Sequence, residues 1–214
     1  ASGIRRGQCV AMLWPANPAA LDAVRSGVER LGASTLPASV PELPAILGAC
    51  RIDAVCAGLE CVSEVQAAIE ASARNRAWGD DRLLCLIGNL TDFNVGLLQQ
   101  LDNRLGGRVY VLLGVPGIAP ALFGATASPD GMLSFAQDCA IAELLHSGTE
   151  ETLKWEDGAT GELILSATEH ECMPLLRYRT GLLVRLRTSQ EDVVRFNFRI
   201  TGLETLPRAD GAET

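Results

Sequence analysis

The chain has 214 residues, of which 48% are hydrophobic and 21% are charged. That balance is typical of a folded globular protein, and the length is sufficient for one sizeable core or two small ones. The net charge is −8 and Lys154 is the only lysine, which argues against a surface that neutralises a nucleic-acid backbone. No apolar run approaches the ~20 residues that cross a bilayer and no signal-peptide pattern opens the chain, so we expect a cytoplasmic protein without membrane contact.

The first half alternates short apolar runs with helical periodicity, as a parallel sheet covered by helices requires. Gly32 is expected to stop the first helix, and Thr91 or Asp92 to cap the last one. In chain order, the pattern predicts a strand at 9–14, a helix at 18–31, an extended segment ending at 37, a helix at 41–50, a strand at 52–56, a helix at 60–78, a strand at 83–87, a helix ending near 105 and a strand at 109–113.

From residue 114 onward glycine and proline accumulate, and the later apolar runs are strand-like. The predicted strands are 140–145, 161–167, 182–186 and 193–200, the last alternating apolar and polar side chains as a strand with one wet face does. We therefore predict an α/β fold with a mixed, largely parallel sheet flanked by helices, followed by a smaller β-rich lobe. The predicted division is 1–117 for the first lobe, 118–206 for the second and 207–214 for a frayed tail, all within one compact domain.

Seven cysteines, an odd number, are scattered along the chain, several of them in apolar runs, which favours buried free thiols over a disulfide framework. His170, Glu171 and Cys172, with Cys139 and His146, are ligand types that zinc accepts, but their spacing matches no metal pattern. No sequence feature pairs a cysteine nucleophile with an orienting acid. We therefore expect neither a metal site nor a catalytic residue.

Two short motifs lie close together in the second half. Residues 161–163 read Gly-Glu-Leu, and residues 174–180 read Pro-Leu-Leu-Arg-Tyr-Arg-Thr. This pair resembles the phenylacetate–CoA ligases, adenylate-forming enzymes in which a Gly-Glu-Leu strand leads into a Pro-x-x-Arg-Tyr-Arg-Thr signature. The order of weaker motifs at 3–7, 29–33 and 37–39 agrees with that family. The resemblance implies the core of a ligase N-terminal domain, and a homodimer, because relatives are often dimers.

The same resemblance suggests where the acyl and nucleotide cleft would lie. A Gly-Ala-Glu-Pro-like turn of the family corresponds to residues 88–91, and its Tyr-Gly-Leu-Thr-Glu motif corresponds to residues 113–117. In α/β sheets such clefts lie at the carboxyl ends of the strands. The candidate cleft residues are Gly88, Asn89, Gly114, Val115, Gly117, Tyr178, Arg179 and Thr180.

Arg177 and Arg179 flank Tyr178 at a strand entry, where two guanidinium groups could bind a carboxylate or a phosphate. They are therefore candidate anion-binding residues. The alternative is an internal salt bridge to Glu162 or Asp138.

Adenylation needs a phosphate loop, a metal, a lysine and a grip on the ribose. By the resemblance, the metal-holding Glu of the family corresponds to Gly117, its preceding hydroxyl residue to Pro116, and its ribose-binding Asp to Leu182. The phosphate loop is expected upstream of residue 1, no counterpart of the lysine-bearing domain is expected beyond residue 214, and Lys154 is predicted to be a solvated surface charge.

The resemblance and these gaps predict a degenerate adenylate-forming domain that needs no cofactor of its own. It would bind a small aryl or acyl carboxylate, or act as a scaffold subunit. A scaffold subunit would have its cleft filled, without a cavity of roughly 300 Å³ or more. The alternative is one half of a split acid–thiol ligase, completed by a partner subunit with the phosphate loop and the lysine; ATP, Mg²⁺ and CoA would be cofactors only in that case.

Overall fold

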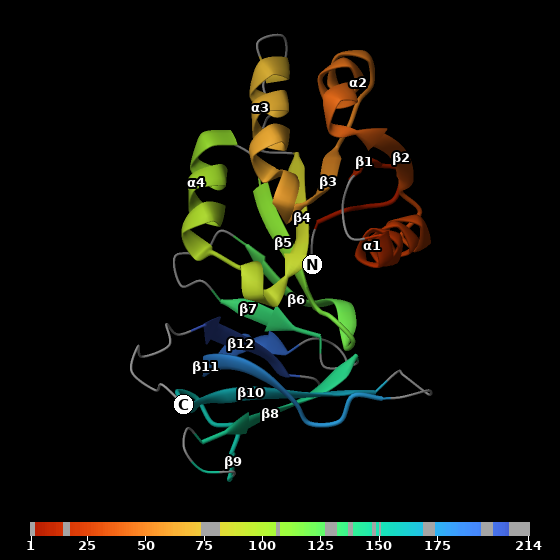
Figure 1. Cartoon of the computed structure of the whole chain (residues 1–214). Coiled ribbons are helices and arrows are strands. Elements are labelled where there is room, and N and C mark those ends of the chain that lie inside the picture. The colour runs from red at the N-terminus through yellow and green to blue at the C-terminus, as the bar shows by residue number, and fades with distance from the viewer. Residues whose placement is uncertain are drawn as a thin grey trace.

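A computed structural model of the chain describes residues 3–14, 18–73, 82–105, 108–126, 132–136, 139–146, 149, 151–168, 174–193 and 199–205. These residues form a helix-covered lobe and a β-rich lobe that lie one above the other (Figure 1). Among the described helices, none is long and apolar enough to cross a membrane.

The first lobe is built on parallel strands in the order β2-β1-β3-β4-β5. Two antiparallel strands, β6 and β7, continue the sheet beyond β5. The central strands are buried along most of their length because helices cover both faces. The bounds are Cys9–Trp14 for β1, Ser34–Ser39 for β2, Ala54–Gly58 for β3, Leu83–Asn89 for β4, Arg108–Val115 for β5, Ala119–Thr126 for β6 and Leu133–Phe135 for β7.

Side chains that alternate along each strand pack into two separate cores. On β4, Leu84 and Leu86 face a cluster that includes residues of three helices, whereas Cys85 and Ile87 face a cluster under the remaining helix. The three helices on one face are α2 (Leu43–Ala49), α3 (Val62–Ala73) and α4 (Val95–Leu105), and the helix on the other face is α1 (Pro18–Arg30). Each fully buried Leu or Ile in these clusters stabilises the fold by about 1.5–3 kcal/mol.

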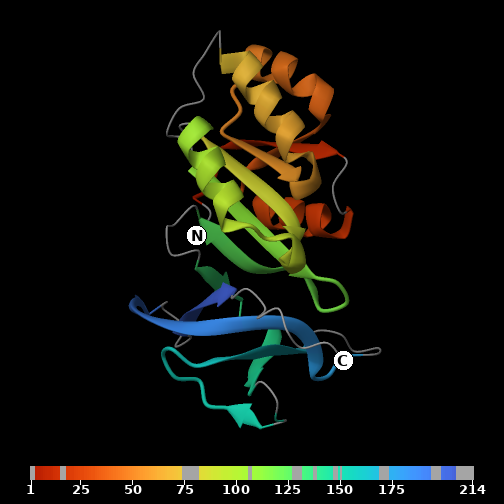
Figure 2. The ribbon, with the colours of Figure 1, turned by 60° about the vertical axis from the view of Figure 1, so that its left-hand side comes forward.

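The second lobe is an antiparallel sheet in the order β12-β11-β10-β8-β9. Strand β7 pairs with both β6 and β12, so hydrogen bonding is continuous from one lobe to the other (Figure 2). The bounds are Ala140–Leu145 for β8, Thr152–Leu153 for β9, Thr160–Ala167 for β10, Tyr178–Val193 for β11 and Arg199–Thr205 for β12.

The predicted fold class is confirmed: a mixed, largely parallel sheet flanked by helices is followed by a smaller β-rich lobe. The predicted break between the lobes, at 117/118, falls in the turn between β5 and β6. The strand predicted at 52–56 lies two residues later in the chain. The predicted tail, 207–214, lies outside the described residues.

Two local predictions are wrong. Residues 193–200 do not form one strand, because Val193 ends β11 and pairs antiparallel with Arg199, which begins β12. Residues 194–198 lie outside the described part of the chain. The cap of α4 is neither Thr91 nor Asp92 but Asn94, whose Oδ1 accepts hydrogen bonds from the N–H groups of the residues two and three positions later. Residues 90–92 instead form a separate 3₁₀ turn, η3 (Leu90–Asp92).

Candidate functional site

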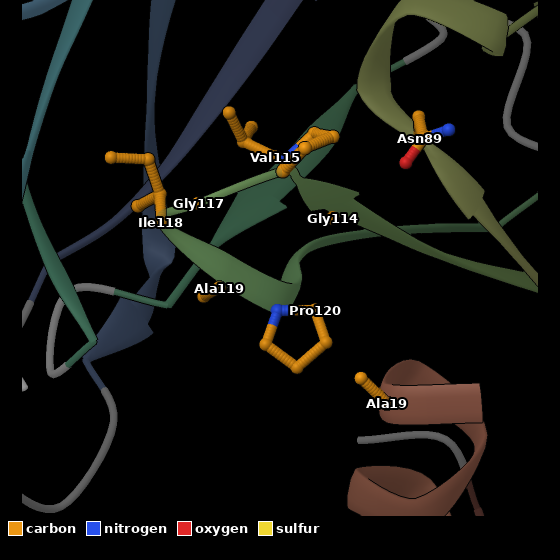
Figure 3. Close-up of a pocket in the computed structure, with 9 residues that line it drawn as sticks. Ala19, Asn89, Gly114, Val115, Gly117, Ile118, Ala119 and Pro120 are labelled. Carbon is orange, nitrogen blue, oxygen red and sulfur yellow. The ribbon is translucent and has the colours of Figure 1, made fainter. Parts of the chain in front are cut away.

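A pocket of about 170 Å³ lies at the carboxyl ends of β4 and β5. Ala19, in the first turn of α1, lies across from Asn89 and Pro120 (Figure 3). The complete lining is Ala19, Asn89, Gly114, Val115, Pro116, Gly117, Ile118, Ala119 and Pro120.

Two glycines shape the turn that forms most of this lining. A Cβ on Gly114 would lie 2.5 Å from the backbone oxygen of Pro120, so only glycine allows β5 and β6 to approach this closely. Gly117 has φ +79°, a left-handed conformation that glycine adopts without strain. A Cβ at this position would also lie 2.9 Å from the Leu175 side chain, so the segment before β11 in the second lobe lies close to this turn.

Asn89 provides the only polar side chain in the described lining. Its Nδ2 donates to Asp92 Oδ2 at 3.2 Å, and Thr91 Oγ1 donates to Asp92 Oδ1 at 3.2 Å. The other lining side chains are apolar or absent, and no described lining residue carries a charge. The pocket therefore suits an apolar group that presents one polar atom to Asn89.

The volume of the pocket limits what it can hold. An engineered cavity of about 150 Å³ is known to bind benzene, whereas pockets for drug-sized ligands exceed about 300 Å³. The 170 Å³ found here accommodates one six-membered ring or a short acyl chain. This volume is below the roughly 300 Å³ expected of an open ligand cleft, so the volume of the candidate cleft does not exclude a scaffold role. A second cavity, of about 340 Å³, lies away from this cleft and is lined by Phe135, Ala140, Ile141, Ala142 and Trp155.

The structure brings together half of the candidate cleft residues. Asn89, Gly114, Val115 and Gly117 line the pocket. Gly88 precedes Asn89 on β4 but is not part of the lining; its Cα faces the Leu59 side chain instead. Whether the four lining residues bind a ligand remains a prediction.

Tyr178, Arg179 and Thr180 begin β11 and lie outside the pocket lining. Tyr178 is 42% exposed. Thr180 Oγ1 donates to the backbone oxygen of Leu163 at 2.8 Å, which fastens β11 to β10.

The two candidate anion-binding arginines both form salt bridges within the chain. Arg179 binds Glu162 through Nε and Nη2, the alternative that the sequence left open. Arg177 Nε lies 3.3 Å from Glu143 Oε2, and Arg177 Nη2 donates to Thr152 Oγ1 at 3.4 Å. Arg179 thus links β11 to β10, and Arg177, which precedes β11, contacts side chains of β8 and β9.

The five lining residues that the sequence reasoning did not include are Ala19, Pro116, Ile118, Ala119 and Pro120. Pro116 was considered only as a replaced hydroxyl residue. Ala119 and Pro120 belong to β6, which was not predicted because the glycines and prolines of this region are also typical of turns. No sequence signal marks Ala19, because its role depends on where α1 begins relative to the sheet.

Leu182, where the resemblance would place the ribose-binding carboxylate, is half-buried and packs against the main core. Its N–H donates to Thr180 Oγ1 at 3.2 Å. At Gly117 the chain likewise offers no side-chain oxygen. Neither position has a side-chain oxygen that could bind Mg²⁺ or accept hydrogen bonds from ribose hydroxyls.

The cysteines and histidines do not form a second centre within the described residues, where no group of three or more candidate metal ligands occurs. Cys139 and His146 lie at opposite ends of β8, about 23 Å apart by the rise of a strand. Residues 170–172 lie outside the described part of the chain. A hydrogen bond with Cys85 and burial raise the pKa of the Cys56 thiol, so this sulfur is a poor nucleophile at neutral pH.

Comparison with known proteins gives a match at the level of structure only. No family model and no curated protein sequence matches the chain. Among solved structures, 2-hydroxyisobutyryl-CoA ligase in the postadenylation state, in complex with 2-HIB-AMP, matches with a TM-score of 0.67 and 16% identity, over 88% of this chain and 41% of that one. The N-terminal subdomain of Klebsiella oxytoca NpsA, in complex with 3-hydroxybenzoyl-AMSN, matches with a TM-score of 0.57 and 13% identity, over 87% of this chain and 53% of that one.

A third match is PA1221, a nonribosomal peptide synthetase (NRPS) protein that contains adenylation and PCP domains. Its TM-score is 0.58 at 13% identity, over 97% of this chain and 38% of that one. The chain thus has the fold of the N-terminal domain of adenylate-forming ligases, and it spans 38–53% of the length of these three structures.

Proposed function

We propose that this chain is a degenerate relative of the phenylacetate–CoA ligases that binds a small aryl or acyl carboxylate without activating it. The observation that carries the proposal is the 170 Å³ pocket at the carboxyl ends of β4 and β5, with an apolar lining and a single amide side chain. Ligands of open α/β sheets bind at this edge. The volume is sufficient for one ring or a short acyl chain, but not for such a group together with a nucleoside.

The carboxylate of such a ligand would remain in contact with water outside the pocket. No described lining residue is cationic, so a buried carboxylate would lose its hydration without gaining a partner. An apolar body inside the pocket and a solvated charge outside it avoid that cost.

Charge at this edge of the sheet argues against a triphosphate. The turns that follow β2, β3 and β4 carry Glu42, Glu60 and Asp92, respectively. All three carboxylates lie at the carboxyl ends of the parallel strands, where they repel an anion of high charge. Together with glycine and leucine at positions 117 and 182, they support binding without adenylation.

We also propose that the protein is a homodimer, as relatives of the ligases often are. Light scattering is expected to give twice the mass of one chain, and a monomer would contradict this part of the proposal. Free thiols at the described cysteines fit a reducing, cytoplasmic compartment.

A thermal-shift screen with aromatic acids, short acyl acids, ATP, AMP and CoA tests the function. A ligand raises the melting temperature according to its concentration relative to Kd, by about 2.7 kcal/mol of stability at 100 Kd. We expect shifts with acids and none with nucleotides. The variant A19W should abolish the shifts, because Ala19 is an exposed helix residue whose enlargement fills the pocket. S26W, at an exposed position of the same helix outside the lining, is the matched control.

Other results would favour the alternatives. Formation of acyl-AMP from ATP by the purified chain would contradict the degenerate function. A shift with ATP and Mg²⁺ would favour the split-ligase alternative, in which a partner completes the site. No shift with any acid would leave the scaffold role as the better account.

A further inference from the structure

The orientation of the Asn89 side-chain amide determines which of its two polar groups, the oxygen or the NH₂, faces the pocket. The neighbouring residue Asp92 has a carboxylate side chain, which accepts hydrogen bonds and has no N–H to donate. The contact between Asn89 and Asp92 Oδ2 therefore requires the NH₂ group of Asn89 on that side. The amide oxygen then lies on the opposite side, toward Gly114, with the nitrogen turned away from the pocket (Figure 3).

Asp92 is itself held in place by the 3₁₀ turn η3. The Phe93 N–H donates to the Leu90 backbone oxygen at 3.4 Å, and the Leu90 side chain is buried at 4% exposure. Thr91 Oγ1 donates a hydrogen bond to the other carboxylate oxygen of Asp92, Oδ1. Because Asn94 caps α4, Asp92 is not needed for that purpose and its contact with Asn89 is a separate feature of the turn.

We propose that Asn89 Oδ1 is a specificity determinant that selects acids carrying a hydroxyl or amino substituent, and that Asp92 is the residue that positions it. This inference rests on the proposed function. An unsubstituted ring would cover Oδ1 and leave that acceptor without a partner, whereas a hydroxyl or amino group donates to it. From the net value of one hydrogen bond, the preference should be about five- to tenfold in Kd.

Calorimetric titration with paired ligands measures this preference. The pairs are 3-hydroxybenzoate with 3-methylbenzoate, and 4-hydroxybenzoate with 4-methylbenzoate, since a methyl group matches a hydroxyl in size but cannot donate. In the unaltered protein, the hydroxylated member of at least one pair should bind about five- to tenfold more tightly. N89L should remove that difference while leaving the methylated acid bound.

The role of Asp92 requires its own variants. D92A removes the acceptor, and D92N offers both an acceptor and a donor, so either variant allows the Asn89 amide to take both orientations. Both should therefore reduce the ratio of hydroxyl to methyl affinity, D92A the more strongly. E70A is the matched control, because Glu70 likewise accepts a hydrogen bond from an amide, that of Gln66, at 2.8 Å on α3 away from the pocket. Circular dichroism of each variant tests whether the fold is retained. Two Asp92 variants are used so that the test remains possible if one of them misfolds.

The outcomes separate the two proposals. Equal affinities within both pairs in the unaltered protein, or a preference that survives in N89L, would overturn the role of Asn89 while the proposed function stands. A preference that survives in D92A and D92N would overturn the positioning role of Asp92. No binding of any of the four acids would overturn the proposed function and this inference with it.

Discussion

At the scale of single residues, Leu182 is predicted to stabilise the fold by packing. By resemblance it replaces a ribose-binding aspartate, and in the structure it is half-buried against the main core. L182D would put an unpaired carboxylate against apolar neighbours and should cost roughly 2 kcal/mol of unfolding free energy without conferring ATP binding. Urea denaturation measures the loss. L176D, at a position that is 70% exposed, is the control; equal stability of the two variants would contradict the packing role.

Arg179 is predicted to act in structure and not in ligand binding. It pairs with Glu162, and their side chains are 60% and 18% exposed. Because solvent screens such a pair, R179A should cost about 1 kcal/mol or less. The affinity for aromatic acids should stay the same, since Arg179 lies outside the pocket lining. A tenfold loss of acid affinity at unchanged stability would restore Arg179 as an anion-binding residue.

At the scale of elements, the β5–β6 hairpin depends on glycine at position 114. G114A would bring a methyl group to 2.5 Å from the Pro120 oxygen and should destabilise the protein by about 1–3 kcal/mol. It should also reshape the pocket. G27A on the exposed side of α1 is the opposite case, because nothing lies within 4 Å and alanine favours helix by about 0.5–1 kcal/mol. Thermal unfolding should show a lower melting temperature for G114A and a higher one for G27A. An unchanged melting temperature of G114A would contradict the close approach of β5 and β6.

The turn η1 (Val40–Glu42) before α2 has a pH-dependent contact. Glu42 Oε2 accepts hydrogen bonds from the Ser39 N–H and hydroxyl, which lower the pKa of Glu42 below its ordinary value of 4.5. Because the pKa of Glu42 is lower in the folded protein than in the unfolded chain, the contact stabilises the fold at pH values above the ordinary pKa. This stabilisation is lost as the pH falls through the pKa of the folded protein. The stability difference between the unaltered protein and E42A should therefore be present at pH 7 and shrink below pH ~4. Urea titrations at several pH values test this, and a pH-independent difference would argue against it.

Regular elements were predictable from sequence because burial imposes periodicity. The alternation of apolar runs and helical patterns predicted the parallel sheet, and β1 and β8 have the predicted bounds. Strands β6 and β7 were not predicted, since they lie among glycines and prolines that a turn would also use. The assignment of Val193 and Arg199 to two different strands was missed because alternating side chains also suit one continuous strand.

The candidate site was only partly predictable for a similar reason. The resemblance placed the cleft at the ends of β4 and β5, and four of the residues it indicated there, Asn89, Gly114, Val115 and Gly117, line the pocket. The contribution of Ala19 depends on the packing of α1 against the sheet, which no local motif encodes. From sequence, Arg177 and Arg179 could bind an anion or form internal salt bridges. Only the pairing of β10 with both β11 and β8 brings the carboxylates within reach.

At the scale of the whole molecule, the central claim is that an adenylate-forming ligase fold binds a small acid at the carboxyl edge of its first-lobe sheet. Amide chemical-shift mapping by nuclear magnetic resonance, during titration with an aromatic acid, tests this most directly. We predict saturable chemical-shift changes concentrated at Asn89, Gly114, Gly117 and Ala119, which line the pocket and carry backbone N–H groups. Shifts concentrated at Arg177–Thr180, or none at saturating acid, would contradict it.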